Sequence, residues 1–521
     1  MKINKSILIL ISFPAFMLFH SCDNDLELLP QDSLTPEAFY ANPENFPAAL
    51  NGVYDALQTS GMYSLMALFD GVTDNAVAQF NSISDFVDYG RGQSSANVNN
   101  NIVDLYQDPF IVIQRANFLL ANIDNEGAIQ AEERNAIRAE AQALRALAYM
   151  RLTYLFGEVP LITTPISREE ILQLNRTSRT DLVNFILDEF GSAANVLGAS
   201  PFNGEEGRFT KQAALGFRAK VLLYEARLGN ANWSEARSAV NEAIVAAETA
   251  GAGLLSVGDG TDGQLNYAAI FFESNEGNEE ALFTVKFDEL DRGGDYYNRF
   301  GVQAGTLYMT VLENLVDDYY TTDGFAITDA NSNYDPANPY ANRDPRLEAT
   351  IIVPGALFSN GGSLEELTPT SNPVAFTSFF LRKQITLEGE IAWNDQGLVD
   401  AIVLRYADLL LMLAEAENEV NGPTATAYDA INQIRARVNM PDVTPALSQD
   451  EFREEVIHER RVELAFEQQR WFDLMTLGIA DEKINGINQF DLSFLPNKQE
   501  LFPIPQTEID LNPNLTQNQG Y

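Results

Sequence analysis

Apolar residues that recur at every third or fourth position are concentrated in two separate parts of this chain. In the first part they run through residues 135–157, 210–229 and 233–248, which are rich in Ala and Leu. This period belongs to one face of an α-helix, so each run predicts a helix. Gly157 and Gly229 follow two of the runs and indicate where those helices end.

A similar pattern returns far downstream. Residues 404–420 and 425–439 are again periodic and Ala-rich, and the turn between them contains a glycine. Both parts thus predict a hairpin of a long helix, a Gly-bearing turn and an Ala-rich helix, which resembles tetratricopeptide (TPR) repeats. We predict a mainly α protein with a TPR-like, α-solenoid-like scaffold, formed mainly by residues 36–250 and 400–480.

Between these parts, residues 254–396 have a different composition. Aromatic residues, Gly, Asn, Asp and Pro dominate, and short alternating runs such as EALFTVKFDEL appear. This pattern predicts loops with a few short strands. Because loops carried on a rigid scaffold are where binding residues usually lie, we expect the ligand site in this region.

The N-terminus has the pattern of a secretory signal. Lys2 and Lys5 precede an apolar run over residues 7–19, which is interrupted by Pro14. This combination is typical of a signal peptide. The run is shorter than the roughly 20 apolar residues that a membrane-spanning helix needs.

The only cysteine of the chain, Cys22, follows the small residue Ser21. This arrangement is typical of a bacterial lipoprotein, in which Cys22 becomes the first mature residue and carries fatty acyl chains such as palmitate. We therefore predict a signal peptide at 1–21, an extended tether at 22–35 and a single domain at 36–521. The alternative is an ordinary cleaved signal with a chance cysteine.

Charge limits the partners of the mature protein. The formal net charge is −41, and removal of residues 1–21, which hold two lysines and no acids, brings it to −43. Such a surface repels nucleic acid and anionic membranes. It also argues, more weakly, against an anionic polymer as ligand, although a local basic pocket would override the global field.

The scarce residues exclude several chemistries. The chain has two histidines, and His20 leaves with the signal, so the mature protein keeps only His458. Zinc sites built on His and Cys are thereby excluded, as are Cys/His nucleophilic pairs. Pairs of carboxylates, the usual tools of glycoside hydrolysis, remain open. With 74 acidic residues in the chain, however, such pairs occur at any spacing by chance.

Several segments spread along the mature chain can be compared with known families. They include LTPEAFYANPENFPAALNGVYDAL, AEAQALRALAYMRLTYLFGEVPL, GRFTKQAALGFRAKVLLYEA, NRDPRLEATIIVPG, LRYADLLLMLAEAENEVNGP, HERRVELAFEQQRWFDLMTLG and LFPIPQTEIDLNPNLTQNQGY. Together, and in this order, they resemble the SusD/RagB family of outer-membrane glycan-binding lipoproteins. The acidic run DNDLE after Cys22 likewise resembles the surface-export signal of lipoproteins in Bacteroidota. The resemblance covers essentially the whole mature chain.

The resemblance implies a surface-exposed, lipid-anchored protein of the outer membrane. It implies a SusD-like fold with a shallow glycan site formed by loops, and a SusC-like TonB-dependent transporter as partner. It implies no catalysis, and we expect no cofactor and no metal. Two alternatives remain open, a surface glycoside hydrolase that uses paired carboxylates and a receptor for peptide or glycopeptide on the same scaffold.

Charged residues in the matching segments are interpreted as structural. Glu463, Glu467 and Arg470 are spaced four and three residues apart, which predicts pairing within one helix. An acid beside an arginine stays ionised, which argues against a catalytic role. Arg405 and Asp408, three residues apart, are predicted to pair inside the scaffold.

A sugar site needs exposed aromatic rings flanked by hydrogen-bonding side chains. Trp471 lies in a helical motif and Trp233 at a helix start, which leaves Trp393, in the polar loop GEIAWNDQG, as the first candidate. The acidic surface favours a neutral, glucan-like ligand. The other candidate glycan-binding residues are Tyr296, Tyr297, Phe86, Tyr89, Arg91, Asp74 and Arg382.

Overall fold

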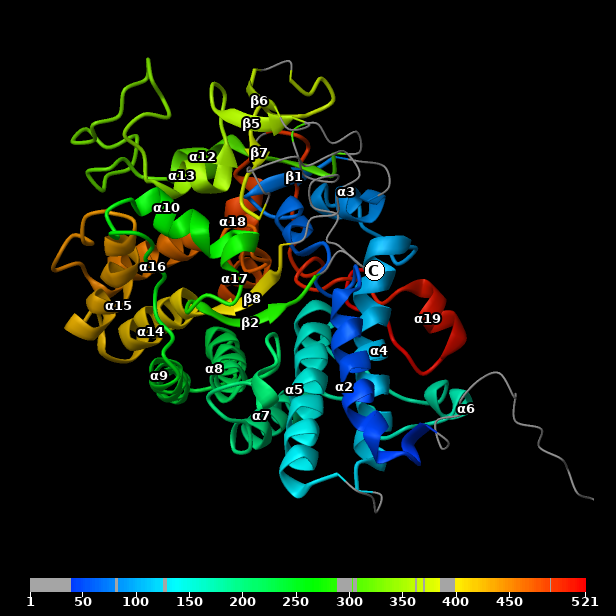
Figure 1. Cartoon of the computed structure of the whole chain (residues 1–521). Helices are drawn as coiled ribbons and strands as arrows, with labels where there is room; N and C mark the ends of the chain where they lie inside the picture. The colour runs from blue at the N-terminus through cyan, green and yellow to red at the C-terminus, as the bar shows by residue number, and fades with distance from the viewer. Residues whose placement is uncertain are drawn as a thin grey trace, which may run out of the picture.

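The computed structural model describes residues 39–79, 83–124, 129–287, 302, 307–360, 363–368, 371–384, 399–487 and 489–521. Helices dominate this part of the chain (Figure 1). Those before residue 250 are α2 (Phe46–Asp55), α3 (Ser84–Gly90), α4 (Asn100–Asn122), α5 (Ala131–Phe156), α6 (Arg168–Ile171), α7 (Arg179–Ala194), α8 (Lys211–Arg227) and α9 (Trp233–Thr249). The later ones are α10 (Gly263–Ala268), α12 (Glu313–Asp318), α13 (Arg346–Thr350), α14 (Tyr406–Asn421), α15 (Ala425–Arg437), α16 (Gln449–Glu463), α17 (Arg470–Leu477), α18 (Ala480–Asn485) and α19 (Gln506–Leu511).

The long helices form one continuous stack. Each of α4, α5, α7, α8, α9, α14 and α15 packs against the next, and Figure 1 shows this order from right to left. The contact between α9 and α14 joins two hairpins that lie about 150 residues apart in the sequence. The predicted TPR-like helical scaffold is therefore confirmed.

The helix ends follow local chemistry. Gly157, which has a φ of +73°, ends α5 and donates its backbone N–H to the carbonyl of Thr153. This left-handed conformation suits glycine. The side chain of Asn232 accepts a bond from the backbone of Ser234 and caps α9. The helices predicted from periodicity are all present, with ends within a few residues of the expected ones.

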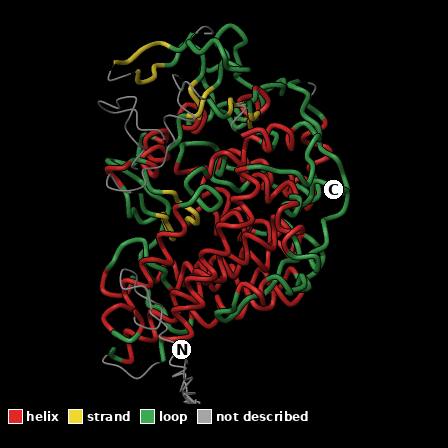
Figure 2. Tube along the Cα trace, turned by 90° about the vertical axis from the view of Figure 1, so that its right-hand side faces the viewer, coloured by secondary structure: helices red, strands yellow, loops and turns green. Residues whose placement is uncertain are grey.

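Short strands and loops lie above the helical stack, as Figure 2 shows. Within the described residues, the strands form four antiparallel pairs, β1–β3, β2–β8, β4–β7 and β5–β6. Their bounds are β1 (Ala76–Ala78), β2 (Ala281–Val285), β3 (Met309–Val311), β4 (Ile351–Ile352), β5 (Leu357–Asn360), β6 (Ser363–Glu366), β7 (Phe380–Leu381) and β8 (Ala401–Arg405). The run EALFTVKFDEL contains β2, as predicted, and β2 pairs with β8 across the base of the loop-rich region.

A buried cluster of charges fixes this base to the helices. Glu463, at the end of α16, accepts from Arg405 at 2.6 Å, from Arg346 at 2.9 Å and from Arg437. All four side chains are at most 2 % exposed. The three cations hold the pKa of Glu463 well below its usual range, against the opposing effect of burial. The prediction of a permanently ionised, structural carboxylate agrees with this geometry.

The predicted pairing within one helix is wrong. Residues 464–469 separate α16 from α17, because Phe466 and Gln468 have left-handed backbones (φ +63° each). Glu467 therefore pairs with Lys383 and Arg405 instead of a helical neighbour. Arg470 faces Asp74 at 2.7 Å.

The predicted pair of Arg405 and Asp408 is also wrong. Arg405 is the last residue of β8 and points its guanidinium at Glu280, Glu463 and Glu467. Asp408, on α14, instead accepts from Lys220 at 2.6 Å and from Arg460 at 3.0 Å. The two residues belong to different buried charge clusters, because the change from strand to helix between them turns their side chains apart.

Candidate functional site

The sequence-based candidates fall into three groups. Trp393, Tyr296 and Tyr297 lie outside the described residues, as does Cys22, so their roles remain predictions. Phe86, Tyr89 and Asp74 are buried. Arg91 and Arg382 are partly exposed.

The buried group corrects the sequence-based choice. Phe86 and Tyr89 lie on the inner face of α3 and are at most 2 % exposed. The ring of Tyr89 stacks on Phe502 at 4.4 Å, and its hydroxyl donates to the carbonyl of Gln499. These rings are therefore part of the core and offer no face to a sugar.

Asp74 is a structural ion-pair partner. Its carboxylate accepts two bonds from Arg470, at 2.8 and 2.7 Å, and lies 3.3 Å from Arg461. Both arginines lower its pKa, although its burial acts in the opposite direction. Asp74 is 1 % exposed and holds α17 to the turn before β1.

A pair of aromatic rings that the sequence analysis did not select lies on the loop-bearing side. Phe376 stacks on Phe490 with the ring centres 5.7 Å apart and the planes 3° from parallel. Phe376 is 41 % exposed, and Val374 beside it is 60 % exposed. An exposed, flat ring backed by a second ring is the kind of surface on which a sugar ring packs.

The position of Phe376 is set by Gln79, which follows β1. The side-chain oxygen of Gln79 accepts from the backbone of Phe376 at 3.1 Å, and its nitrogen donates to the carbonyl of Val374 at 3.3 Å. The hydroxyl of Thr310, on β3, donates to the same oxygen. The turn that carries Phe376 is thus tied to a sheet.

Arg91 belongs to the same locality. It follows α3 and forms a backbone bridge with Ser493, three residues after Phe490. The backbone of Ser493 also donates to Gly90 at 2.9 Å. Three segments distant in sequence, around residues 91, 376 and 490, therefore meet on the loop-bearing side. We call Phe376, Phe490 and Arg91 the aromatic-pair site.

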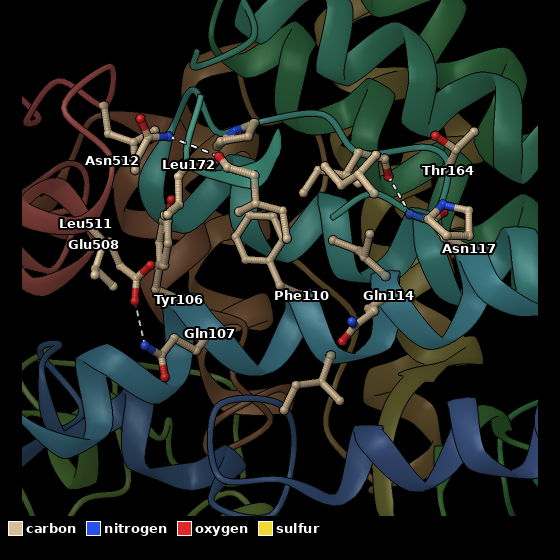
Figure 3. A pocket seen from close by; sticks show the side chains of 18 of the residues that line it. Tyr106, Gln107, Phe110, Gln114, Asn117, Thr164, Leu172, Glu508, Leu511 and Asn512 are labelled. Atoms are coloured by element: carbon tan, nitrogen blue, oxygen red, sulfur yellow. Dashed lines mark hydrogen bonds between the residues drawn. The ribbon is translucent and has the colours of Figure 1, made fainter. Parts of the chain in front are cut away.

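A different cavity, of about 280 Å³, lies beside α4. Figure 3 shows Tyr106, Phe110 and Gln114 of α4 on one side, and Leu172 with the α19 region opposite. Gln107 donates to Glu508 at 2.6 Å. The side-chain amides of Asn117 and Asn512 in the walls already donate to backbone carbonyls, and most of the other lining residues are apolar. This cavity does not have the hydrogen-bonding surface that a sugar requires.

A third hollow, of about 320 Å³, contains the predicted residue Arg382. It lies between α10, α13 and residues 382–384, and its lining includes Phe272 and Gln384. We call it the Arg382 pocket. It combines an aromatic wall with polar donors, as the sequence analysis expected for a sugar site.

Two acidic side chains of the described residues, Asp70 and Asp400, have the pKa of a general acid but are buried. Burial raises the pKa of both Asp70 and Asp400 to about 6, the range that a general acid requires. Asp70 is 1 % exposed and Asp400 is 3 % exposed. Neither carboxyl group can therefore reach a glycosidic bond of a bound polymer.

Two family sequence models match the chain. One, described as "SusD family", matches residues 279–521. The other, of SusD-like type, is described as "Starch-binding associating with outer membrane" and matches residues 26–223. Together the two matches cover most of the chain.

The chain belongs to the SusD family.

Relatives and solved structures agree with this SusD-family assignment over nearly the full length. A SusD-like protein, P25, of Formosa agariphila is 28 % identical, and the match covers 97 % of this chain and 98 % of the relative. A SusD-like protein of Bacteroides fragilis superposes with a TM-score of 0.80 at 24 % identity, covering 95 % of this chain and all of the other. A SusD-like carbohydrate binding protein of the same species has a TM-score of 0.78 at 27 % identity, covering 92 % and 100 %.

No helix in the described part of this SusD-family chain is both long and apolar enough to cross a bilayer. In the same residues no group of three or more His, Cys, Asp or Glu side chains is arranged to hold a metal ion.

His458 has a structural position. It lies on α16, and its Nε2 is 2.7 Å from the carbonyl oxygen of Asp318. Its ring stacks on Tyr320 at 3.9 Å. The histidine thus joins α16 to the end of α12 at the edge of the core, which is a structural role.

Proposed function

We propose that this SusD-family protein is a non-catalytic glycan receptor of the bacterial surface, which delivers oligosaccharide to a SusC-like TonB-dependent transporter. The observation that carries the proposal is the exposed Phe376–Phe490 pair on a rigid helical scaffold. The family description as starch-binding, and the carbohydrate binding protein with the same fold, support the same ligand class.

The aromatic-pair site has the components that a sugar requires. The apolar face of a pyranose packs on Phe376, and Arg91 supplies hydrogen-bond donors for the outward hydroxyl groups. Because Gln79 and Phe490 hold the ring of Phe376 in place, little side-chain freedom is lost on binding. Trp393, outside the described residues, remains a proposed contact.

Anchoring is proposed through acylated Cys22. The described fold begins at residue 39, which leaves a connection of 16 residues after Cys22. Two or more acyl chains hold a protein firmly at a membrane without spanning it. The SusC-like transporter is proposed as the partner because the chain is similar to SusD-family proteins.

Replacement of Phe376 by alanine is expected to weaken glycan binding five- to tenfold, because a stacked ring contributes about 1 kcal/mol beyond its buried area. Affinity electrophoresis in gels cast with a panel of polysaccharides identifies the ligand, and titration calorimetry measures the change. Val245→Ala, at an exposed position on α9, is the matched control. Equal affinity of the Phe376→Ala variant and the unaltered protein would remove this ring from the site.

Trp393→Ala is expected to reduce retardation in the same gels while the circular dichroism spectrum stays unchanged. An indole presents a larger flat face than a phenyl ring, so the loss should equal or exceed that of Phe376→Ala. Unchanged migration would exclude Trp393 from the site.

The enzyme alternative is tested with the same material. A receptor leaves the bound polysaccharide intact, whereas a glycoside hydrolase releases new reducing ends. Release of reducing ends by the purified protein, and its loss on mutation of a carboxylate, would overturn the proposal.

A further inference from the structure

The Arg382 pocket contains buried hydrogen-bond donors that lack partners. The Nε atom of Arg382 and the Nε2 atom of Gln384 are both buried, and neither has a hydrogen-bond partner among the described residues. The Gln384 side chain lines the pocket and is only 7 % exposed. Because an unsatisfied buried donor costs about 1–3 kcal/mol, such donors call for an explanation.

The charge of Arg382 is poorly compensated. Its guanidinium donates to the carbonyl of Leu357 at 3.0 Å, but no carboxylate of the described residues lies within 4.0 Å of it. Burial lowers its pKa, and Glu348 opposes this effect only through its charge. The neighbouring cation differs, because Lys383 pairs with Glu467 at 2.5 Å. Arg382 therefore brings to this pocket a positive charge that has no close counter-ion among the described residues.

The remaining walls fit a sugar ring. Phe272 is 37 % exposed and Leu265 is 42 % exposed, so an apolar face is open to solvent. Asp262 lies at the edge, where one of its oxygens accepts from the backbone of Leu265 and caps α10. The volume of about 320 Å³ falls at the lower end of the range for small-molecule sites.

The backbone of Gln384 has an unusual conformation. Gln384 has a φ of +61°, a left-handed conformation that a side chain with a Cβ rarely adopts. Strain of this kind persists where the surrounding structure imposes it, and it concentrates at ligand sites.

We propose that the Arg382 pocket binds an anionic sugar residue of the glycan, one that bears a carboxylate or a sulfate ester. The anionic group accepts from Arg382 Nε and Gln384 Nε2, the ring lies against Phe272, and a hydroxyl donates to Asp262. This inference rests on the proposed function and narrows its ligand class. An anionic ligand differs from the neutral one that the global charge of −41 favoured. The two desolvated donors act on the ligand at short range, whereas salt screens the effect of the distant surface charges.

The test uses the full mature chain in detergent and titration calorimetry with four oligosaccharides of similar length. These are an oligogalacturonate, its methyl ester, a sulfated galactan fragment and a neutral glucan. We expect binding of the uronate or of the sulfated fragment, with the affinity falling as salt is raised. The methyl ester distinguishes a carboxylate requirement from recognition of the sugar alone.

Two variants locate the binding. Arg382→Gln and Gln384→Ala are each expected to lower the affinity for the anionic ligand ten- to a hundredfold, because each removes a hydrogen bond to a charged group. Arg168→Gln, at an exposed position on α6, is the control and should change nothing. If Arg382→Gln fails to fold, the affinity of Gln384→Ala for the anionic ligand still tests the pocket.

The outcomes separate this inference from the proposed function. If a neutral glycan binds in a Phe376-dependent manner and neither anionic ligand binds, the inference fails and the proposed function stands. Anionic binding that both variants leave unchanged also overturns the inference. If no saccharide binds at all, the proposed function fails first.

Discussion

Replacement of Glu463 by alanine is expected to lower the free energy of unfolding by about 3–5 kcal/mol, the cost of leaving buried charges without their partner. Glu463 accepts from Arg405, Arg346 and Arg437, and its side chain is 0 % exposed. Its loss leaves three guanidinium groups around an empty space at the base of the loop-rich region. Urea unfolding followed by circular dichroism measures the change.

Two control variants isolate the charge. Glu454→Ala, at an exposed position on the same helix, should alter stability by less than about 0.5 kcal/mol. Glu463→Gln keeps the shape but removes the charge and should lie between the two. A loss below about 1 kcal/mol for Glu463→Ala would show that the cluster does not hold the base together.

The same carboxylate gives the expected response to acid. The folded-state pKa of Glu463 lies well below its ordinary value of 4.5. Its contribution to stability is therefore fully present above about pH 4.5 and is lost as the pH falls toward the folded-state pKa. Unfolding by acid should accordingly begin below this pH, and Glu463→Ala should show a weaker dependence.

Replacement of Asp70 by asparagine is expected to stabilise the protein by about 2–3 kcal/mol at pH 7. Burial raises the pKa of Asp70 to about 6, chiefly because the charged form is desolvated. One oxygen accepts from Asn75 at 2.7 Å and from the backbone of Phe466 at 3.2 Å, and asparagine can preserve both bonds. The other oxygen has no partner among the described residues.

The sign of the effect depends on pH. Between about pH 4 and pH 6 the unfolded chain releases the proton of Asp70 while the folded chain keeps it, so stability falls as the pH rises through this interval. The advantage of Asp70→Asn should therefore vanish near pH 4. Asp74→Asn, four residues away, should have the opposite effect, because Asp74 pairs with Arg470 and its pKa is lowered. Equal changes in both variants would contradict the account.

The helical scaffold was predictable because its signals are local. Periodic alanines and leucines mark the helices, and residues such as Gly157 and Asn232 set their ends within a single turn. The break after α16 was not predictable in this way. Phe466 and Gln468 adopt left-handed backbone conformations although neither is a glycine, so the local sequence gives no sign of the break.

The site was harder to predict because its contacts span the sequence. Phe376 and Phe490 stack although 114 residues separate them, and no spacing rule relates the two. Phe86 and Tyr89 were mistaken for surface rings, although their spacing of three residues on a helix matches one buried face. Arg382 was selected for its chemistry and approximate location, and its role in ligand binding stays a prediction.

The pairing of β2 with β8 has a consequence for how this family diversifies. The two strands begin and end the excursion between residues 285 and 401, so main-chain bonds clamp its ends beside the helical stack. Within the excursion, Arg346 and Lys383 are tied to Glu463 and Glu467, so only the exposed loops are free to change. Insertions or substitutions in those loops would leave the helical stack unchanged, because the clamped strands absorb none of the change.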